Sequence, residues 1–381
     1  MTGFGLPAGT MLAVRELRRA RVRFGLLVAA LGLLVFLILF QASLQNGLLT
    51  SFVGAIRNQS APVLVYSVDG QRVIQASVIT PELDAAVRSV EGIGDTGWIG
   101  QGTFTVAAGG QRHDASIVGV DNPALGYPRS LSAGRLPSGL GEAVASDADG
   151  DLGFALGDTV VVEPGGLVLT IVGVGRDIQL NAGPTLFTDF STYSEAVLSN
   201  NPDGMAPLPN LVAIAPGPGM DEADLIRRIN EASPDLDALG RSQAADLTPG
   251  VAQVRQSFRV IFLLYGLVIP CVTGLFFLII TFQKAAALTL LRAVGAPAGR
   301  LVGALATQTI TILGAAFVVG LALYTPLSQQ RLGSIPLRFE TGAVVVWLVL
   351  LFTLGLLSSL LAARRVLAID PIAATTGRGD L

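Results

Sequence analysis

The sequence predicts a membrane protein with four transmembrane α-helices and an α+β extracytoplasmic domain between the first two. Its 381 residues are 51% hydrophobic and only 14% charged, whereas soluble domains carry about a quarter charged residues. Four apolar runs have the length of about 20 residues that a helix needs to cross about 30 Å of hydrocarbon. A long Gly-rich segment with alternating apolar residues separates the first run from the second, which is typical of a domain in water.

The four apolar runs define the predicted transmembrane segments. They cover residues 24–44, 258–283, 301–324 and 342–363. The first run is longer than the apolar core of a signal peptide and lacks a clear small-residue cleavage site, so we interpret it as a membrane anchor. Pro270 and Gly274 in the second run either kink that helix or are the Pro and Gly that membrane helices often contain. Both interpretations stay open.

Basic residues predict the orientation of the chain. They gather in three segments, 1–23, 284–300 and 364–381, which lie on one side of the membrane if the four spans alternate. The first segment contains five arginines, among them Arg15, Arg18 and Arg19. The positive-inside rule places both termini in the cytoplasm. Arg331 and Arg338, in the short outer loop 325–341, oppose this orientation but are outnumbered.

The long segment 45–257 is the predicted outer domain. It contains two strand–helix–strand patterns, whose helices cover residues 80–90 and 220–232, and a β-rich stretch inserted between them at about 110–200. Thr80 is expected to cap the first of these helices, and Pro81 to occupy its first turn. We therefore expect two βαβ-like halves with an inserted β-subdomain. Leu44, Leu48, Phe52 and Ile56 repeat at helical spacing, which predicts that the first span continues outward as a stalk helix; a second stalk is expected to lead into the second span.

The composition excludes several kinds of chemistry. One histidine, His113, and one cysteine, Cys271, exclude a multi-histidine metal site, an internal disulfide and a CxxC motif. The only lysine, Lys284, lies between Gln283 and Ala285, so this sequence contains no P-loop, which requires Gly-Lys-Ser/Thr. We predict that the chain is not an enzyme and carries no cofactor. Its net charge of −3 gives no indication of nucleic-acid binding.

Two polar features are weak signals. His113 stands in a turn-like polar stretch, "GGQRHDAS", and is predicted to be a solvated loop residue. The segment 147–158 has the aspartate spacing that begins a calcium loop, but its sixth position is Leu152 and its twelfth is Asp158, where such loops have Gly and Glu. A solvated hairpin region is the favoured interpretation, and no metal site is expected.

The segment between the second and third spans, "KAAALTLLRAVGAPAGR" (284–300), has a helical pattern. Leu288, Leu291 and Val294 repeat every three residues and make a narrow apolar stripe. Gly295 is placed to end this helix, and Pro297 blocks its continuation. Either the segment is a loop that only sets the topology, or its apolar stripe contacts a cytoplasmic partner.

The order of these motifs resembles the MacB/FtsX-type permeases of ABC transporters over nearly the whole chain. "LAVRELRRARVRFGLL" is similar to the basic helix before the family's first span, and "LTLLRAVGAPAGRL" to its cytoplasmic signature. "GDTVVV…LTIVGVGRD" resembles its β-rich outer subdomain, and "AARRVLAIDPIAAT" its closing segment. The cytoplasmic signature also resembles the subgroup with haem-efflux and glycolipid-export permeases. Ala286 and Ala287 stand where the family often has an acidic residue, so one charged contact to a partner is in doubt.

The resemblance implies a division of labour between chains. Two copies of a separate cytoplasmic ATPase would bind ATP and Mg, and a second permease chain, expected to be an identical one, would complete the membrane core among the lipids. The segment 284–300 would then be the coupling helix that docks on the ATPase. The residues of this signature are Leu288, Leu291, Arg292, Val294, Gly295, Ala296 and Pro297.

The resemblance also leaves two functions open. The favoured one is the permease subunit of an exporter in a bacterial inner membrane, which expels a lipid, drug, peptide or haem by mechanotransmission. The alternative is a non-transporting FtsX-like transducer that controls an outer partner such as a cell-wall hydrolase. The large outer domain favours the exporter, because the FtsX branch has a smaller one. The sequence identifies neither the substrate nor its binding residues.

Overall fold

A computed structural model describes residues 21–293, 298–332 and 335–367. The chain divides into two compact units. The helical unit comprises Met1–Gln45, Ser257–Gln330 and Leu337–Leu381, and the outer unit comprises Asn46–Gln256 with Arg331–Pro336. The helical unit holds long apolar helices and the outer unit a mixed α/β domain, so the predicted fold class is confirmed.

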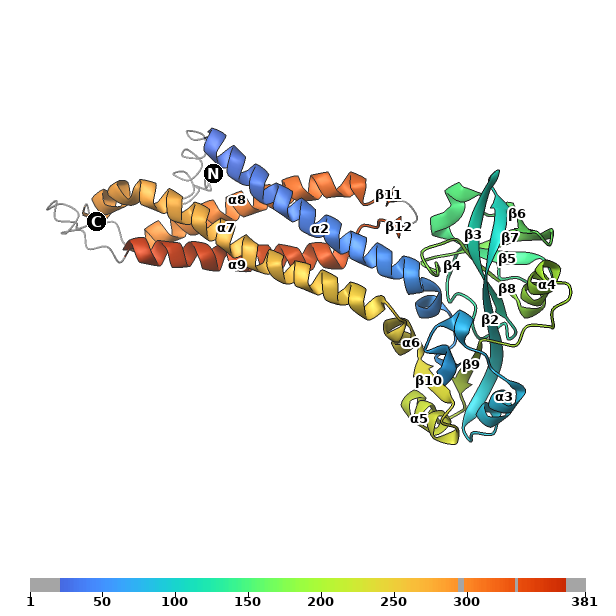
Figure 1. Cartoon of the computed structure of the whole chain (residues 1–381). Helices are drawn as coiled ribbons and strands as arrows, with labels where there is room; N and C mark the ends of the chain where they lie inside the picture. Colours follow the sequence, from blue (N-terminus) through green and yellow to red (C-terminus); the bar gives the residue numbers. More distant parts are fainter. Residues whose placement is uncertain (1–20, 294–297, 333–334, 368–381) are drawn as a thin grey trace, which may run out of the picture. The chain divides into compact units, whose positions relative to one another are not determined.

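Four helices of the described residues are long and apolar enough to cross a membrane (Figure 1). They are α2 (Arg21–Asn58), α7 (Val251–Ala293), α8 (Ala298–Leu327) and α9 (Thr341–Leu367). Helix α2 continues past residue 44 and α7 begins before residue 258, where the sequence predicts stalk helices. Both helices are therefore continuous across the boundary between the two units.

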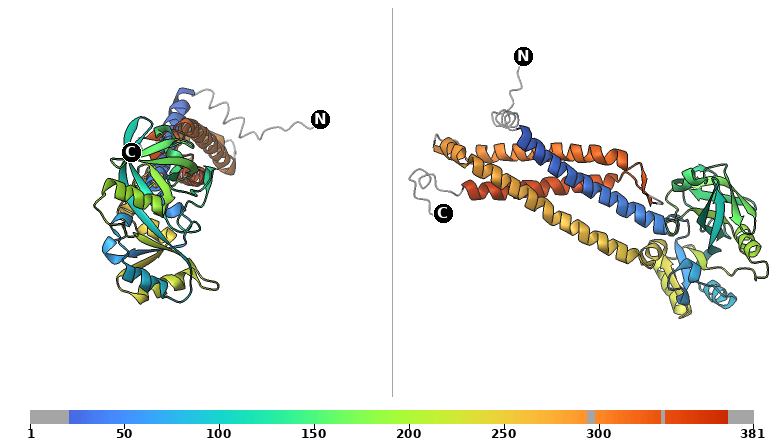
Figure 2. Two further views of the ribbon diagram at one scale, coloured as in Figure 1. Left: turned by 90° about the vertical axis from the view of Figure 1, so that its right-hand side faces the viewer. Right: turned by 45° about the horizontal axis from the view of Figure 1, so that its top comes forward.

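The long helices of the helical unit lie side by side (Figure 2). Small residues let them approach closely. A Cβ atom on Gly320 of α8 would lie 2.7 Å from the carbonyl oxygen of Gly32 in α2, and one on Gly355 of α9 would lie 2.6 Å from Leu313 of α8. Membrane helices commonly pack through such small residues, because lipid supplies no hydrophobic drive between them. Leu31 and Ile312 are fully buried in the resulting apolar core.

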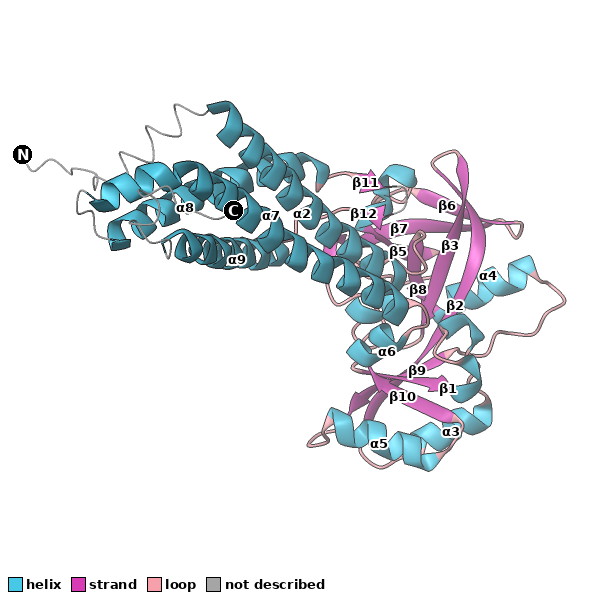
Figure 3. Cartoon of the chain, turned by 60° about the vertical axis from the view of Figure 1, so that its left-hand side comes forward, coloured by secondary structure: helices cyan, strands magenta, loops and turns pink. Residues whose placement is uncertain are grey.

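The outer unit is built on a ten-stranded sheet (Figure 3). Nine strands follow the order β10-β1-β9-β2-β3-β8-β5-β7-β4, and β6 pairs with both β2 and β7. A separate two-stranded sheet joins β11 to β12. The strands are β1 (Val63–Ser67), β2 (Ile93–Ala108), β3 (Gln111–Val120), β4 (Leu131–Gly134), β5 (Glu142–Ser146), β6 (Thr159–Glu163), β7 (Leu167–Gly175), β8 (Thr185–Asp189), β9 (Leu211–Pro216), β10 (Leu236–Gly240), β11 (Arg331–Leu332) and β12 (Ile335–Pro336).

Shorter helices connect or cover these strands. The α-helices are α3 (Pro81–Arg88), α4 (Phe190–Asn200), α5 (Glu222–Ala232) and α6 (Arg241–Leu247). The 3₁₀ helices are η1 (Val68–Gly70), η2 (Ile74–Ala76) and η3 (Asp147–Leu152). The side chain of Thr80 caps α3 by accepting a hydrogen bond from the backbone N–H of Leu83 at 3.4 Å, and Pro81 takes the first helical position, as predicted.

Two βαβ units interleave at one end of the sheet. One is β1-α3-β2 and the other β9-α5-β10, and their strands alternate in the order β10-β1-β9-β2 with antiparallel neighbours. This is the arrangement of ferredoxin-like folds, and it confirms the two predicted βαβ-like halves. Strand β1 is buried on both faces: Val63 and Val65 pack beneath α3 and α5, whereas Leu64 and Tyr66 enter a second core on the opposite face.

The β-subdomain is inserted between these units, from β3 to α4. The 16-residue strand β2 joins it to the ferredoxin-like part, because its first half pairs with β9 and its second half with β6. Two predictions within it were wrong. His113 lies on β3 with its ring 5.8 Å from that of Phe154, not in a solvated turn. Asp149 lies in η3 and is 1% exposed, not part of a solvated hairpin.

Candidate functional site

The predicted coupling segment lies at the end of α7. That helix runs unbroken to Ala293, so Leu288, Leu291 and Arg292 continue the second span instead of forming a separate short helix. The cause is local, because residues 284–293 are mostly Ala and Leu, which favour helix. Outside the described residues lie Val294, Gly295, Ala296 and Pro297, together with Arg15, Arg18 and Arg19. Their predicted roles stay predictions.

Pro270 and Gly274 mark a close contact between α7 and α9. The Ser358 hydroxyl of α9 donates to the carbonyl oxygen of Pro270 at 2.9 Å. A Cβ atom on Gly274 would lie 2.3 Å from the same hydroxyl oxygen, so a larger residue there would displace this hydroxyl from its present position. The sequence did not identify Ser358 as the partner, because nothing local in α9 distinguishes it from its neighbouring serine.

The outer end of α2 is interrupted by a loop from the β-subdomain. Val53 has non-helical φ and ψ of −134° and 16°. There the backbone of residues 177–182 inserts: the N–H of Ala55 donates to the carbonyl oxygen of Gln179 at 2.9 Å, and the N–H of Asn181 donates to that of Phe52 at 3.1 Å. The inserted loop therefore satisfies backbone groups that the broken helix leaves unpaired.

Both stalk helices end in one apolar core of the outer unit. Leu49, Val53 and Ile56 of α2 and Val251 of α7 are buried there with the sheet residues Leu64 and Tyr66. Burial of such side chains contributes about 1.5–3 kcal/mol each. The ends of the two helices are thus parts of the outer unit's hydrophobic core, not flexible linkers leading to it.

Asp246 of α6 joins the two stalk helices through charge. Its Oδ1 accepts hydrogen bonds from Arg57 of α2 at 2.7 Å and from Arg255 of α7 at 2.5 Å. The hydrogen bond from Arg255, more than the added charge of Arg57, lowers the pKa of Asp246. The bridge is therefore present at neutral pH and is lost only as the pH falls through that lowered value.

A second charged group connects α2, the β-subdomain and the segment between α8 and α9. Ser51 of α2 donates to the side-chain oxygen of Gln179 at 3.0 Å, and the Gln179 amide donates to Oδ1 of Asp149 at 2.6 Å. Arg331 of β11 contacts the same oxygen at 3.3 Å. Burial raises the pKa of Asp149 to about 6, because it outweighs the stabilisation of the carboxylate by Gln179 and Arg331.

The short strand β12 packs directly on α2. A Cβ atom on Gly47 would lie 2.5 Å from the carbonyl oxygen of Pro336 and 3.1 Å from the Ile335 side chain. Glycine at position 47 is therefore required for this approach. No sequence pattern predicts this contact, because β11 and β12 hold only two residues each and lie almost 300 positions away from Gly47.

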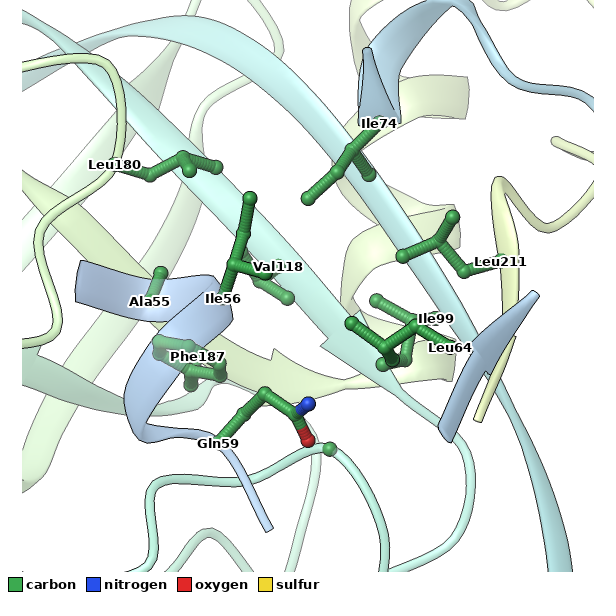
Figure 4. Close-up of a pocket in the computed structure, with 11 residues that line it drawn as sticks. Ala55, Ile56, Gln59, Leu64, Ile74, Ile99, Val118, Leu180, Phe187 and Leu211 are labelled. Carbon is green, nitrogen blue, oxygen red and sulfur yellow. The ribbon is translucent and has the colours of Figure 1, made fainter. Parts of the chain in front are cut away.

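The outer unit contains a small apolar cavity of about 20 Å³ (Figure 4). Ile56, Leu64, Ile99, Val118 and Phe187 are among its walls. Gln59 is its one polar wall residue with a long side chain, and its amide already bonds the backbone of Ala61. A cavity of this size accommodates about one water molecule, so it is a packing defect and not a substrate site.

The curated proteins similar to this chain are described as transporter permeases. An uncharacterised ABC transporter permease of Mycobacterium tuberculosis is 24% identical, and the match covers 96% of this chain and 99% of that permease. A putative hemin transport system permease protein, HrtB of Staphylococcus haemolyticus, is 19% identical over 96% of this chain. No protein-family profile matches the chain. Within the described residues, no three His, Cys, Asp or Glu side chains are grouped to hold a metal ion.

Two solved structures are partly similar to the chain. The periplasmic region of MacB from Actinobacillus actinomycetemcomitans has a TM-score of 0.36 and 14% identity, and covers 49% of this chain and 92% of its own. The extracellular domain of YknZ, from Gram-positive bacteria, has a TM-score of 0.33 and 14% identity, and covers 47% of this chain and 100% of its own. The fold assignment above depends on the chain's own strand order.

Proposed function

We propose that this chain, similar over nearly its whole length to ABC transporter permeases, is the membrane subunit of an ATP-driven exporter of the MacB/FtsX type. The observation that carries the proposal is the similarity over 96% of the chain, which includes a protein named as a hemin transport permease. The alternative, a non-transporting transducer that controls an outer partner, is distinguished by the experiment below.

Mechanotransmission is the proposed mechanism. Helices α2 and α7 each run from the helical unit into the apolar core of the outer unit, where α2 is interrupted at Val53. A displacement of α7 at its cytoplasmic end would therefore reach that core along one helix, whose hydrogen-bond ladder lacks the donor of Pro270. The bridge from Asp246 to Arg57 and Arg255 supports joint movement of the two helices.

The proposed complex contains two copies of a cytoplasmic ATPase and a second copy of this chain. The ATPases would bind ATP and Mg, since this sequence has no P-loop. Both termini are proposed to be cytoplasmic in a bacterial inner membrane, because the basic residues gather on that side. The proposed substrate is hydrophobic or amphipathic, since the four predicted spans contain no Asp, Glu, Lys or His to form the polar path that an ion or sugar needs.

The exporter proposal is tested in proteoliposomes that contain the chain and its ATPase. We expect ATP-dependent movement of at least one candidate among labelled lipid, drug, peptide and haem. A Walker-B Glu→Gln substitution in the ATPase serves as the control and abolishes movement. Hydrolysis of ATP without movement of any candidate would contradict the exporter proposal and favour the non-transporting transducer.

The coupling segment is tested by charge on its apolar stripe. Replacing Leu288 and Leu291 by Glu is expected to leave insertion intact and to abolish both ATPase binding and transport, because the stripe is proposed to pack on the ATPase. Thr289→Glu, off the stripe, is the matched control and retains both activities. Co-purification measures binding of the ATPase, and a transport assay measures substrate movement. Wild-type binding by the double variant would make the segment a topology-setting loop only.

A further inference from the structure

The hairpin β11–β12 has an unusual place in the chain. The residues on either side of it, up to Gln330 and from Leu337, belong to the helical unit, whereas Arg331–Pro336 belong to the outer unit. Its two strands share only two residue pairs, Arg331 with Pro336 and Leu332 with Ile335. Such a short pair is not stable alone, so contacts with the rest of the outer unit must hold it in place.

Two of these contacts are specific. One is steric: β12 lies against Gly47 of α2. The other is ionic: Arg331 contacts Asp149, whose carboxylate is 1% exposed, while the Arg331 side chain is 23% exposed. Because Gln179 bonds the same carboxylate and also accepts from Ser51, the hairpin is connected through side chains to the outer part of α2.

The ionic contact is incompletely formed. Arginine and carboxylate groups favour two parallel hydrogen bonds, but here a single contact of 3.3 Å joins them. Oδ2 of Asp149 and Nε of Arg331 are buried without a hydrogen-bond partner in the described part of the chain. A buried pair of this kind gains little net free energy over an apolar pair, since loss of water offsets the attraction, but removing one of its charges leaves the other uncompensated and is strongly destabilising. Loss of the charge on Asp149 therefore decides whether the contact holds.

The groups around Asp149 favour a switch in the mildly acidic range. Gln179, from the loop after β7, and Arg331, from β11, favour the carboxylate, whereas burial and the neighbouring Asp147 of η3 oppose it. The result is the pKa of about 6 given above. Asp149 is therefore largely ionised at about pH 7.5 and about nine-tenths protonated at about pH 5. A protonated carboxyl group keeps its bond from Gln179 but loses its charge attraction to Arg331.

We propose that Asp149 and Arg331 form a proton-sensitive latch, which holds the β11–β12 hairpin on the outer unit while Asp149 is ionised and releases it when Asp149 is protonated. The latch belongs to the outer unit and goes beyond the proposed export function. Its location outside the predicted spans, on the side away from the basic termini, would expose it to the pH of the medium. Release would free the only segment of the outer unit that lies between α8 and α9.

Hydrogen–deuterium exchange of the full chain in lipid nanodiscs tests the latch. The readout is the protection factor of peptides covering residues 330–337, which corrects for the intrinsic effect of pH on exchange. In the wild type we expect protection to fall about tenfold or more between about pH 7.5 and about pH 5, following the ionised fraction of Asp149. Asp149→Asn should be unprotected at both pH values. Asp151→Asn, an exposed aspartate of the same 3₁₀ helix, is the matched control and should behave as the wild type.

Two further variants keep the test decisive if Asp149→Asn does not fold. Arg331→Gln removes the other charge and should likewise abolish protection at both pH values. Gly47→Leu pushes the hairpin away without altering a charge, and gives the exchange rate of the released state. Equal wild-type protection at both pH values, or a pH response that persists in Asp149→Asn or Arg331→Gln, would overturn the latch. Since neither ATP hydrolysis nor transport is read, that result would leave the export proposal standing.

Discussion

Tyr66 shows how a buried polar atom constrains the outer unit at the scale of a single residue. Its side chain is fully buried in the core that receives the two stalk helices. Its hydroxyl finds no hydrogen-bond partner among the described residues. Burial raises the pKa of this tyrosine above its usual value, with a smaller contribution from Asp237. The hydroxyl therefore costs free energy that no contact recovers.

Tyr66→Phe is expected to stabilise the outer unit by about 1 kcal/mol, because it removes an unpaired buried hydroxyl and keeps the ring. Urea unfolding of the full chain in detergent measures this. Of the two tryptophans, Trp98 lies in the outer unit and Trp347 in α9, so a Trp347→Phe background leaves fluorescence that reports the outer unit alone. A loss of stability would show that the hydroxyl has a partner, such as an ordered water.

Local rules predicted some residues well and missed others. Thr80 and Pro81 were assigned correctly, because a helix cap depends only on the next three residues. His113 and Asp149 were assigned to solvent, because polar sequence surroundings usually mean exposure. The ring contact of half-buried His113 and the burial of Asp149 depend on Phe154, Gln179 and Arg331, which are distant in sequence or in another element. No periodicity or spacing rule contains that information.

At the scale of elements, the interruption of α2 is the main departure from the sequence pattern. The apolar positions Leu48, Phe52 and Ile56 keep helical spacing straight through the break at Val53. The break is imposed by the inserted loop, in which Asp177, Asn181 and Ala182 adopt positive φ angles of 57°, 53° and 56°. Residues other than glycine rarely adopt such angles, so the loop is held in place by its bonds to α2.

Gly54→Ala tests this insertion. Alanine normally stabilises a helix relative to glycine, but its Cβ would lie 2.4 Å from the carbonyl oxygen of Asp177. We expect the outer unit to lose about 2 kcal/mol or more, as for other steric conflicts in a core. Gly150→Ala is the control, because no atom lies within 4 Å of its added Cβ. The same urea titration measures the free energy of unfolding of both variants. Equal stability of the two would mean that the inserted loop shifts to accommodate the added Cβ atom.

Strand β10 lies at an edge of the sheet, and the sequence pattern did not predict how the free backbone groups of this edge are covered. The Asn230 side chain of α5 accepts from the backbone N–H of Ala238 at 2.7 Å and donates to its carbonyl oxygen at 3.2 Å. It thus occupies the positions that a further strand would use. Edges blocked in this way resist unwanted pairing with other chains. The strand itself was predicted, but its neighbour in space was not.

At the scale of the whole molecule, composition and hydropathy were sufficient for the main division. Four apolar runs and one long mixed segment predicted four membrane helices and an outer α+β domain, and these are large features that average over many residues. The candidate site was predicted only in part. Arg57, Asp246 and Arg255 lie far apart or in different elements, so their convergence between the stalk helices depended on the fold.

Asp246→Ala is expected to uncouple ATP hydrolysis from transport. Partly exposed ion pairs contribute about 0–1 kcal/mol to stability, so folding should be nearly unchanged. Loss of the bridge between α2 and α7 should reduce the transport per ATP hydrolysed by about fivefold or more, the factor for a coupling of about 1 kcal/mol.

Parallel transport and phosphate-release assays in proteoliposomes measure this ratio. Asp237→Ala, which removes an ion pair to Arg72 away from the stalks, is the matched control. An unchanged ratio in Asp246→Ala would mean that the shared apolar core alone transmits the movement.

Because the ends of α2 and α7 are part of the outer unit's apolar core, they must be included in any soluble fragment of that unit. A fragment that begins after residue 58 and ends before residue 251 would lack Leu49, Val53, Ile56 and Val251 and would expose the apolar surface beneath them. A fragment of residues 46–256 keeps that core but omits Arg331–Pro336. Its Asp149 would then lack the arginine, so its acid titration would differ from that of the intact protein.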